Sequence, residues 1–146
     1  KYLYPQSTGD LGINGAIDPA DVEKMLEQDP SIQAGMITSP TYDGVVSDVR
    51  RIADVAHSYG IPLIVDEAHG AHFGFHPYFP KNSNTLGADI VIHSLHKTLP
   101  AFTQTALLLL GGMREAAVEK FLGIYETSSP SYVLMTGIER CILCAR

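Results

Sequence analysis

The sequence has few of the features that mark secreted, membrane-spanning or nucleic-acid-binding proteins. Its 146 residues include only two cysteines, Cys141 and Cys144, and we expect no signal peptide and a reduced, cytoplasmic location. No run of lysine or arginine occurs and the formal net charge is −6, which argues against nucleic acid or an anionic membrane as the main partner. The longest apolar run, residues 106–110, is too short to span a membrane and suits a buried strand.

Metal-binding patterns are equally scarce. Cys141 and Cys144 have CxxC spacing, but a zinc site of this kind needs a second pair, so the pattern favours core packing. His69, His72 and His76 lie close together, yet their spacing fits no single helical face and their loop contains glycine and proline. We therefore predict no metal site.

Two short polar segments stand out against this background. Residues 65–69 (Val-Asp-Glu-Ala-His) and 94–97 (Ser-Leu-His-Lys) each follow an apolar run, residues 61–65 and 89–92, that is typical of a buried strand. In an open α/β sheet, ligands bind beyond the carboxyl ends of the strands. The two segments would then place an acid, a small residue and a histidine opposite a lysine, which are groups that can hold and tune pyridoxal phosphate.

Each of these residues also has a simpler interpretation. A lone lysine such as Lys97 is usually a solvated surface charge, and Asp66 could be a turn residue or a helix cap.

Residues 66–69 also spell the magnesium-binding box of a class of RNA helicases. Such an enzyme needs a GxxxxGK[ST] loop, which this sequence does not contain, although the loop could lie upstream. The acidic balance and residues 94–97 favour the cofactor interpretation.

Strand and helix patterns alternate along the chain. Asp18 and Pro19 mark a helix start, and residues 45–59 form an amphipathic pattern. This alternation predicts an α/β fold with a mostly parallel sheet flanked by helices. The first predicted helix runs from residue 19 toward residues 29–30, and the others cover residues 45–59, 113–122 and 132–143. The predicted strands cover residues 33–38, 61–65, 89–92 and 105–110.

The two ends look like cuts through a longer polypeptide. The chain opens without an initiating Met, and it stops just beyond the helical pattern of residues 132–143 with no cap or breaker. We therefore expect further protein on both sides.

Four motifs in order resemble the Orn/Lys/Arg decarboxylase family. They are residues 39–44 (Ser-Pro-Thr-Tyr-Asp-Gly), 65–69, 94–100 (Ser-Leu-His-Lys-Thr-Leu-Pro) and 127–132 (Thr-Ser-Ser-Pro-Ser-Tyr). These enzymes use pyridoxal phosphate and have the three-layer α/β fold of aspartate aminotransferase. The resemblance implies that residues 1–146 are part of the large cofactor-binding domain. The phosphate-binding loop would lie upstream and the small C-terminal domain downstream.

The resemblance also assigns roles at the cofactor. Lys97 would attach to it through a Schiff base, and Asp66 would keep the pyridine nitrogen protonated so that the ring withdraws electrons. Ala68 would pack beneath the ring and His69 would lie near the ring hydroxyl. The family positions near the phosphate and the Schiff base would correspond to Ser94 and His96.

Other assignments leave alternatives open. Ser39 and Thr41 match candidates for contacts to the ring hydroxyl, but the same residues could simply form a turn. Thr127, Ser128 and Ser129 resemble the segment that reaches the neighbouring subunit's site, which implies a homodimer or a higher homo-oligomer; an N-cap for the last helix explains them equally well.

The implied reaction is the α-decarboxylation of arginine, lysine or ornithine to the corresponding amine. Alternatives are another reaction on the same fold, such as amino transfer or acyl condensation, or a non-catalytic structural fragment. Glu67 and Glu126 could meet the distal cation of a substrate, or could have surface or packing roles. We expect residues 1–146 alone to be inactive.

Overall fold

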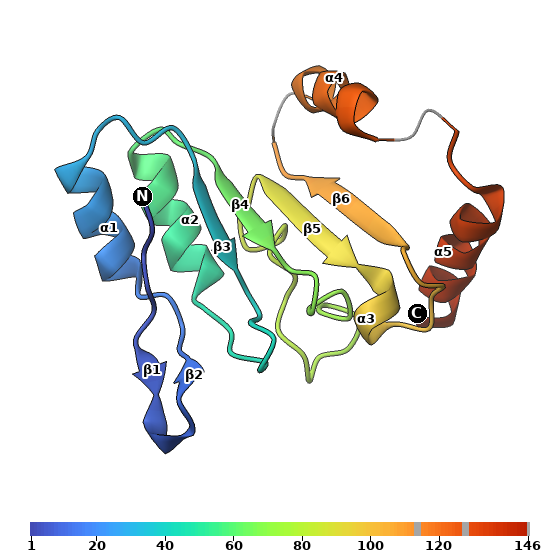
Figure 1. Ribbon diagram of the computed structural model, residues 1–146, viewed down its shortest axis with the longest axis horizontal. Coiled ribbons are helices and arrows are strands. Elements are labelled where there is room, and N and C mark those ends of the chain that lie inside the picture. Colours follow the sequence, from blue (N-terminus) through green and yellow to red (C-terminus); the bar gives the residue numbers. More distant parts are fainter. Residues whose placement is uncertain (113–114, 127–128, 146) are drawn as a thin grey trace.

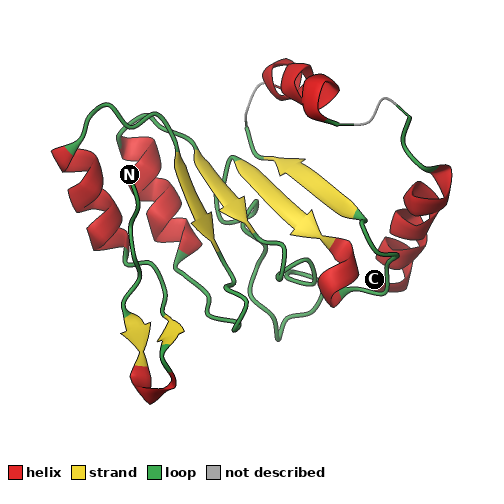
Figure 2. Cartoon of the chain, viewed as in Figure 1, coloured by secondary structure: helices red, strands yellow, loops and turns green. Residues whose placement is uncertain are grey.

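The computed structural model describes residues 1–112, 115–126 and 129–145. Its centre is a four-stranded sheet in the order β3-β4-β5-β6 (Figures 1 and 2). The elements in chain order are β1 (Ser7–Thr8), η1 (Gly9–Leu11), β2 (Ile13–Asn14), α1 (Pro19–Gln28), β3 (Gly35–Thr38), α2 (Val49–Ser58), β4 (Leu63–Asp66), β5 (Ile90–Ser94), α3 (Leu95–Thr98), β6 (Ala106–Leu110), α4 (Glu115–Tyr125) and α5 (Tyr132–Ala145).

The sheet is mostly parallel, as predicted. β3, β4 and β5 run in one direction, whereas β6 pairs antiparallel with β5. Apolar side chains at matching register, Ile37, Val65, Val91 and Leu109, form a row across all four strands and belong to the main core. Helix α2 packs its fully buried Ile52 into this core, which fixes one face of the sheet.

Helix starts follow from their caps. The Asp18 carboxylate accepts a 2.9 Å hydrogen bond from the backbone N–H of Ala20, so α1 begins where the sequence predicts. Helix α2 begins at Val49, four residues later than predicted, because Asp48 is its N-cap and accepts from the N–H of Arg51 at 3.1 Å. The intervening residues remain in the loop after β3 and help to shape it.

The sequence did not indicate the short β1–β2 hairpin, which projects from the rest of the molecule in Figure 1. The C-terminal helices α4 and α5 lie beyond β6 in the same view. The predicted helix at residues 113–122 is observed as α4, with residues 113–114 outside the described part of the chain. Among the described residues, no helix is both long and apolar enough to cross a membrane.

Candidate active site

The carboxyl ends of β3, β4 and β5 meet at one edge of the sheet. Thr38 pairs with Asp66, and Asp66 pairs with Ile92, so the three strands end at nearly the same level. Two backbone hydrogen bonds extend this alignment beyond the strands, from Ser39 N–H to the Asp66 carbonyl and from Glu67 N–H to the Ile92 carbonyl, both 3.0 Å. The structure therefore brings the segments predicted from sequence to the same edge.

Asp66 is the last residue of β4 and is half-buried. Its Oδ1 accepts a 3.1 Å hydrogen bond from the backbone N–H of Ala68, so it does act as a turn residue. Its Oδ2 has no hydrogen bond with any residue that the structure describes. Because a carboxylate can accept about four hydrogen bonds, Asp66 keeps capacity for a ligand while it shapes the turn.

Lys97 lies on α3, a single helical turn that follows β5 directly. Buried Leu95 anchors this turn, and the Leu95 N–H donates to the Thr105 carbonyl at 3.0 Å. Lys97 is exposed and forms no hydrogen bond or ion pair within the described ranges. Next to it, the buried Thr98 Oγ1 also has no hydrogen-bond partner there. The exposed amine of Lys97 is therefore available to a ligand at this edge.

The histidine of this segment has a defined tautomer. His96 Nδ1 lies 3.1 Å from the Thr105 carbonyl oxygen, which can only accept. Nδ1 must therefore carry the hydrogen, and Nε2 remains for a second interaction. Ser94, the last residue of β5, is half-buried and is the residue that precedes this turn.

Other predicted residues lie on the loops beside this edge. Ala68 is buried, and half-buried His69 meets the ring of Tyr42 edge-on at a centroid distance of 5.4 Å. Tyr42 is 84% exposed and was not predicted as a site residue, although its motif was. This contact joins the loop after β3 to the turn after β4.

Ser39 and Thr41 have roles within their own loop. Ser39 Oγ accepts from the N–H of Ser47, and Thr41 Oγ1 accepts from the N–H of Val45, each at 3.1 Å. These bonds match the simple turn interpretation. Each hydroxyl still has a hydrogen to donate, so contact with a cofactor stays a prediction.

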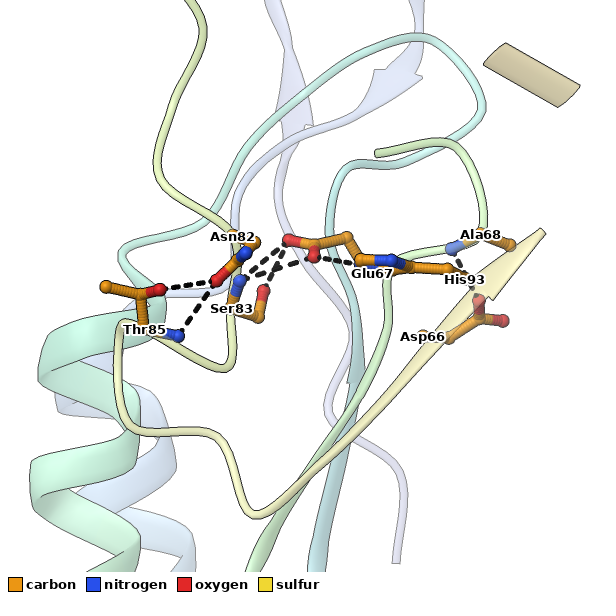
Figure 3. Close-up of polar contacts among 7 residues, drawn as sticks. All are labelled: Asp66, Glu67, Ala68, Asn82, Ser83, Thr85 and His93. Carbon is orange, nitrogen blue, oxygen red and sulfur yellow. Dashed lines mark hydrogen bonds and ion pairs between the residues drawn. The ribbon is translucent and has the colours of Figure 1, made fainter. Parts of the chain in front are cut away.

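For Glu67 the structure favours the packing alternative. Glu67 was a candidate for the distal cation of a substrate or for packing, and the structure shows it 1% exposed with both carboxylate oxygens bonded inside the chain. Figure 3 shows the carboxylate between Ser83 and His93. The sequence did contain a signal for this placement. Glu67 directly follows Asp66, and because side chains alternate along a strand, the two carboxylates are expected on opposite faces of the sheet.

The turn after Asp66 is tightly packed. A Cβ added to Gly70 would lie 2.7 Å from Glu67 Cγ and 2.8 Å from Pro40 Cδ. No side chain larger than hydrogen fits there without movement, because real Cβ atoms do not approach this closely. Gly70 therefore lets the turn close onto the loop that follows β3.

The remaining candidates are placed less centrally. His72 packs edge-on against Phe73 and Phe79, and burial lowers its pKa below the ordinary value while the Glu67 charge opposes the shift. Cys141 is buried, in line with a packing role, whereas Cys144 is exposed. The described ranges contain no group of three or more metal-ligating side chains arranged for a metal ion.

The segment predicted to reach a neighbouring subunit is only partly described. Thr127 and Ser128 lie outside the described residues, and Ser129 precedes Pro130. At the start of α5 the capping contact involves Ser131 instead, whose Oγ accepts from the N–H of Leu134 at 3.4 Å. Glu126 is exposed just after α4, and no contact within the described chain fixes its role.

The fold is that of a known class of pyridoxal-phosphate enzymes. The crystal structure of apo CalE6, a methionine gamma lyase from Micromonospora echinospora, superimposes with a TM-score of 0.63, covering 84% of this chain and 33% of the other, at 19% sequence identity. This similarity shows the aspartate-aminotransferase-like fold and no more.

Sequence comparison then gives the family. The model of the Orn/Lys/Arg decarboxylase major domain matches residues 1–142. The uncharacterized protein YaaO of Bacillus subtilis is 38% identical over 141 residues, and the arginine decarboxylase of the same organism is 34% identical over 143. Each alignment covers 94% of this chain and 29% of the relative. The chain therefore belongs to the Orn/Lys/Arg decarboxylase family and spans under a third of these relatives' length.

The residues at the sheet edge fit pyridoxal phosphate chemically. They supply an acceptor for a protonated ring nitrogen, an unpaired amine for the aldehyde, and hydroxyl and imidazole groups nearby. Membership of the Orn/Lys/Arg decarboxylase family points to the same cofactor.

Proposed function

We propose that this chain is the cofactor-binding part of an enzyme that removes the α-carboxylate of arginine, lysine or ornithine with pyridoxal phosphate. The observation that carries the proposal is the meeting of Asp66 and the Lys97 turn at one sheet edge. Membership of the Orn/Lys/Arg decarboxylase family supports the reaction and the class of substrate.

Asp66 has the role of holding a positive ring nitrogen. Its half-buried carboxylate is fixed by the bond from Ala68 N–H, so Oδ2 keeps one direction without reorganisation when a ligand arrives. A protonated pyridine ring supplies the electron sink that stabilises the negative charge left when carbon dioxide departs.

Lys97 has the role of amine nucleophile. The turn that carries it is tied to Thr105 by Leu95 N–H and by His96 Nδ1, so the lysine extends from a rigid base. Ala68 is buried and small, and the family resemblance places it beneath the cofactor ring, where a larger side chain would displace the ring. His69 and His96 are the candidates for moving a proton near the reacting carbon.

We further propose that the enzyme is a homodimer or a higher homo-oligomer in the cytoplasm. The segment 127–132 resembles the one that reaches the neighbouring site in this fold, and both cysteines are free thiols. The mass of the complete protein in solution, measured by sedimentation, tests the assembly; a monomer with full activity would contradict it.

The proposal is tested on the complete protein with pyridoxal phosphate and each of the three basic amino acids. We expect carbon dioxide and the matching amine, with one amino acid preferred. Borohydride reduction followed by peptide mapping should then place the cofactor on Lys97. A keto acid as the main product would indicate amino transfer instead, and failure to form any adduct would reject the cofactor assignment.

A further inference from the structure

A buried polar cluster lies directly behind the candidate active site. Its members are Glu67, Ser83 and His93, which are 1%, 0% and 5% exposed. Ser83 donates from Oγ to Glu67 Oε1 at 2.6 Å, and its backbone N–H lies 3.1 and 3.2 Å from the two carboxylate oxygens. His93 Nε2 lies 2.6 Å from Oε2 (Figure 3). The cluster ties together the β4 turn, the loop before β5, and β5 itself.

The backbone bond of this cluster has a fixed direction. The N–H of Ser83 can only donate, so both Glu67 oxygens act as acceptors toward it. When His93 Nε2 carries the hydrogen, Glu67 receives three donors, and the contacts with Ser83 Oγ and His93 Nε2 are both short, at 2.6 Å. A buried carboxylate is stable only with such donors, so the loss of one is costly.

The cluster lies on the opposite side of the strands from the predicted cofactor residues. Glu67 sits between Asp66 and Ala68 in the chain, and His93 immediately precedes Ser94. Because successive side chains of a strand alternate, Asp66 and Ser94 point away from the face that holds Glu67 and His93. Figure 3 shows the side chains of Asp66 and Glu67 pointing apart.

The Glu67–His93 bond therefore joins the turn after β4 to β5, next to Asp66 on one side and next to Ser94 on the other. The Glu67 N–H adds a second link by donating to the Ile92 carbonyl at 3.0 Å. Together the two bonds fix the spacing and tilt of the β4 turn relative to the end of β5. Asp66 directly precedes the turn after β4, and the turn that carries Lys97 directly follows β5.

We propose that Glu67 and His93 are positioning residues, which hold the Asp66 carboxylate and the Lys97 turn in the relative geometry that pyridoxal phosphate requires. This inference rests on the proposed function and adds to it two residues that do not touch the cofactor. Ser83 supports Glu67 through its hydroxyl and its N–H.

The test compares four variants of the complete protein. Glu67→Gln keeps the shape but replaces one acceptor by a donor, and His93→Leu removes the Nε2 donor. His93→Gln restores an N–H close to the position of Nε2, and Glu23→Gln on the exposed surface of α1 is the matched control. For each, we would measure the cofactor dissociation constant, the pH midpoint of the bound cofactor's visible band, and the melting temperature of the cofactor-free protein.

We expect Glu67→Gln and His93→Leu to weaken cofactor binding by about 10- to 100-fold, the range seen when outer partners of metal ligands are removed. Both should also move the pH midpoint, because a displaced Asp66 holds the ring proton less well. His93→Gln should recover most of the affinity, and Glu23→Gln should match the unmodified protein.

Two results would overturn the inference. If the variants lose only melting temperature and keep the affinity and the pH midpoint, the cluster merely stabilises the fold. If the unmodified protein binds no pyridoxal phosphate, the proposed function fails first, and the positioning role fails with it. Should Glu67→Gln not fold, Ser83→Ala removes a single hydroxyl donor and is expected to give a smaller affinity loss with the same shift in pH midpoint.

Discussion

Asp66 and Glu67 are neighbouring carboxylates with opposite surroundings. Glu67 is 1% exposed and its oxygens are bonded to Ser83 and His93, so it has little capacity for a ligand. Asp66 is half-buried, and within the described chain its carboxylate accepts one hydrogen bond, from Ala68 N–H, so its Oδ2 remains available to a ligand. Strand alternation alone assigns the two acids to opposite faces.

The comparison separates two kinds of polar residue at one sheet edge. On the Glu67 side, the polar groups of Glu67, Ser83 and His93 form hydrogen bonds with one another and hold the strands and loops together. Groups on the Asp66 side, with Lys97 and Thr98, have hydrogen-bonding capacity left over within the described chain. Substitutions on the two sides should therefore have different consequences, which four experiments can test.

The largest effect is expected for Lys97→Ala. Without the amine nucleophile, decarboxylation by the complete protein should fall by several orders of magnitude, while the melting temperature stays within the experimental error because Lys97 is exposed. Lys24→Ala, at an exposed position of α1, should leave the rate unchanged. Equal rates for the two variants would remove Lys97 from the site.

Asp66→Asn should have the next largest effect. The amide keeps the shape of the turn but no longer stabilises a positive ring nitrogen, so we expect the turnover number to fall on the order of 100-fold or more. Asp54→Asn, on the exposed side of α2, is the control. If Asp66→Asn unfolded the protein but left the turnover of the folded fraction intact, Asp66 would have a structural role like that of Glu67.

Gly70→Ala should damage the turn through packing. The added Cβ would meet Glu67 Cγ and Pro40 Cδ, and overpacking of this kind costs about 1–3 kcal/mol. The same substitution at Gly123 on α4, where no atom lies within 4 Å, should raise stability by up to about 1 kcal/mol. Urea unfolding of both variants would measure the difference, and shifts of the same sign would contradict the packing argument.

The smallest effect concerns pH. Burial lowers the pKa of His72 in the folded state from its ordinary 6.5, so the unfolded state takes up the proton first as the pH falls. The contribution to stability is complete above pH 6.5 and is lost as the pH drops toward the lower folded pKa. His72→Phe should flatten the fall in unfolding free energy as the pH drops below 6.5, and an unchanged slope would show that other groups cause this fall.

Much of the fold could be predicted from local signals. The apolar runs at β4 and β5 and the Asp18 cap each act over a few residues, so they are visible in the sequence. The start of α2 was wrong because the sequence offers a helical pattern from Val45, whereas the Asp48 cap and the loop bonds of Ser39 and Thr41 decide the outcome.

The site was predictable in part for the same reason. Its motifs follow strands, so topology brings them together without detailed packing. The Glu67 cluster was not predictable, because Ser83 and His93 lie 16 and 26 positions further along and meet the acid only in the folded sheet. The contact of Tyr42 with His69 likewise depends on how two loops pack.

The reversed direction of β6 has a consequence for the order of folding. The β5–β6 pair closes over a short connection that contains α3, so the lysine turn belongs to a local unit with low contact order. Asp66 joins it only through the parallel β4–β5 pairing, which must close a longer loop. We therefore expect the lysine turn to form early and its carboxylate partner to arrive late, so that competence to bind a ligand marks the last stage of folding.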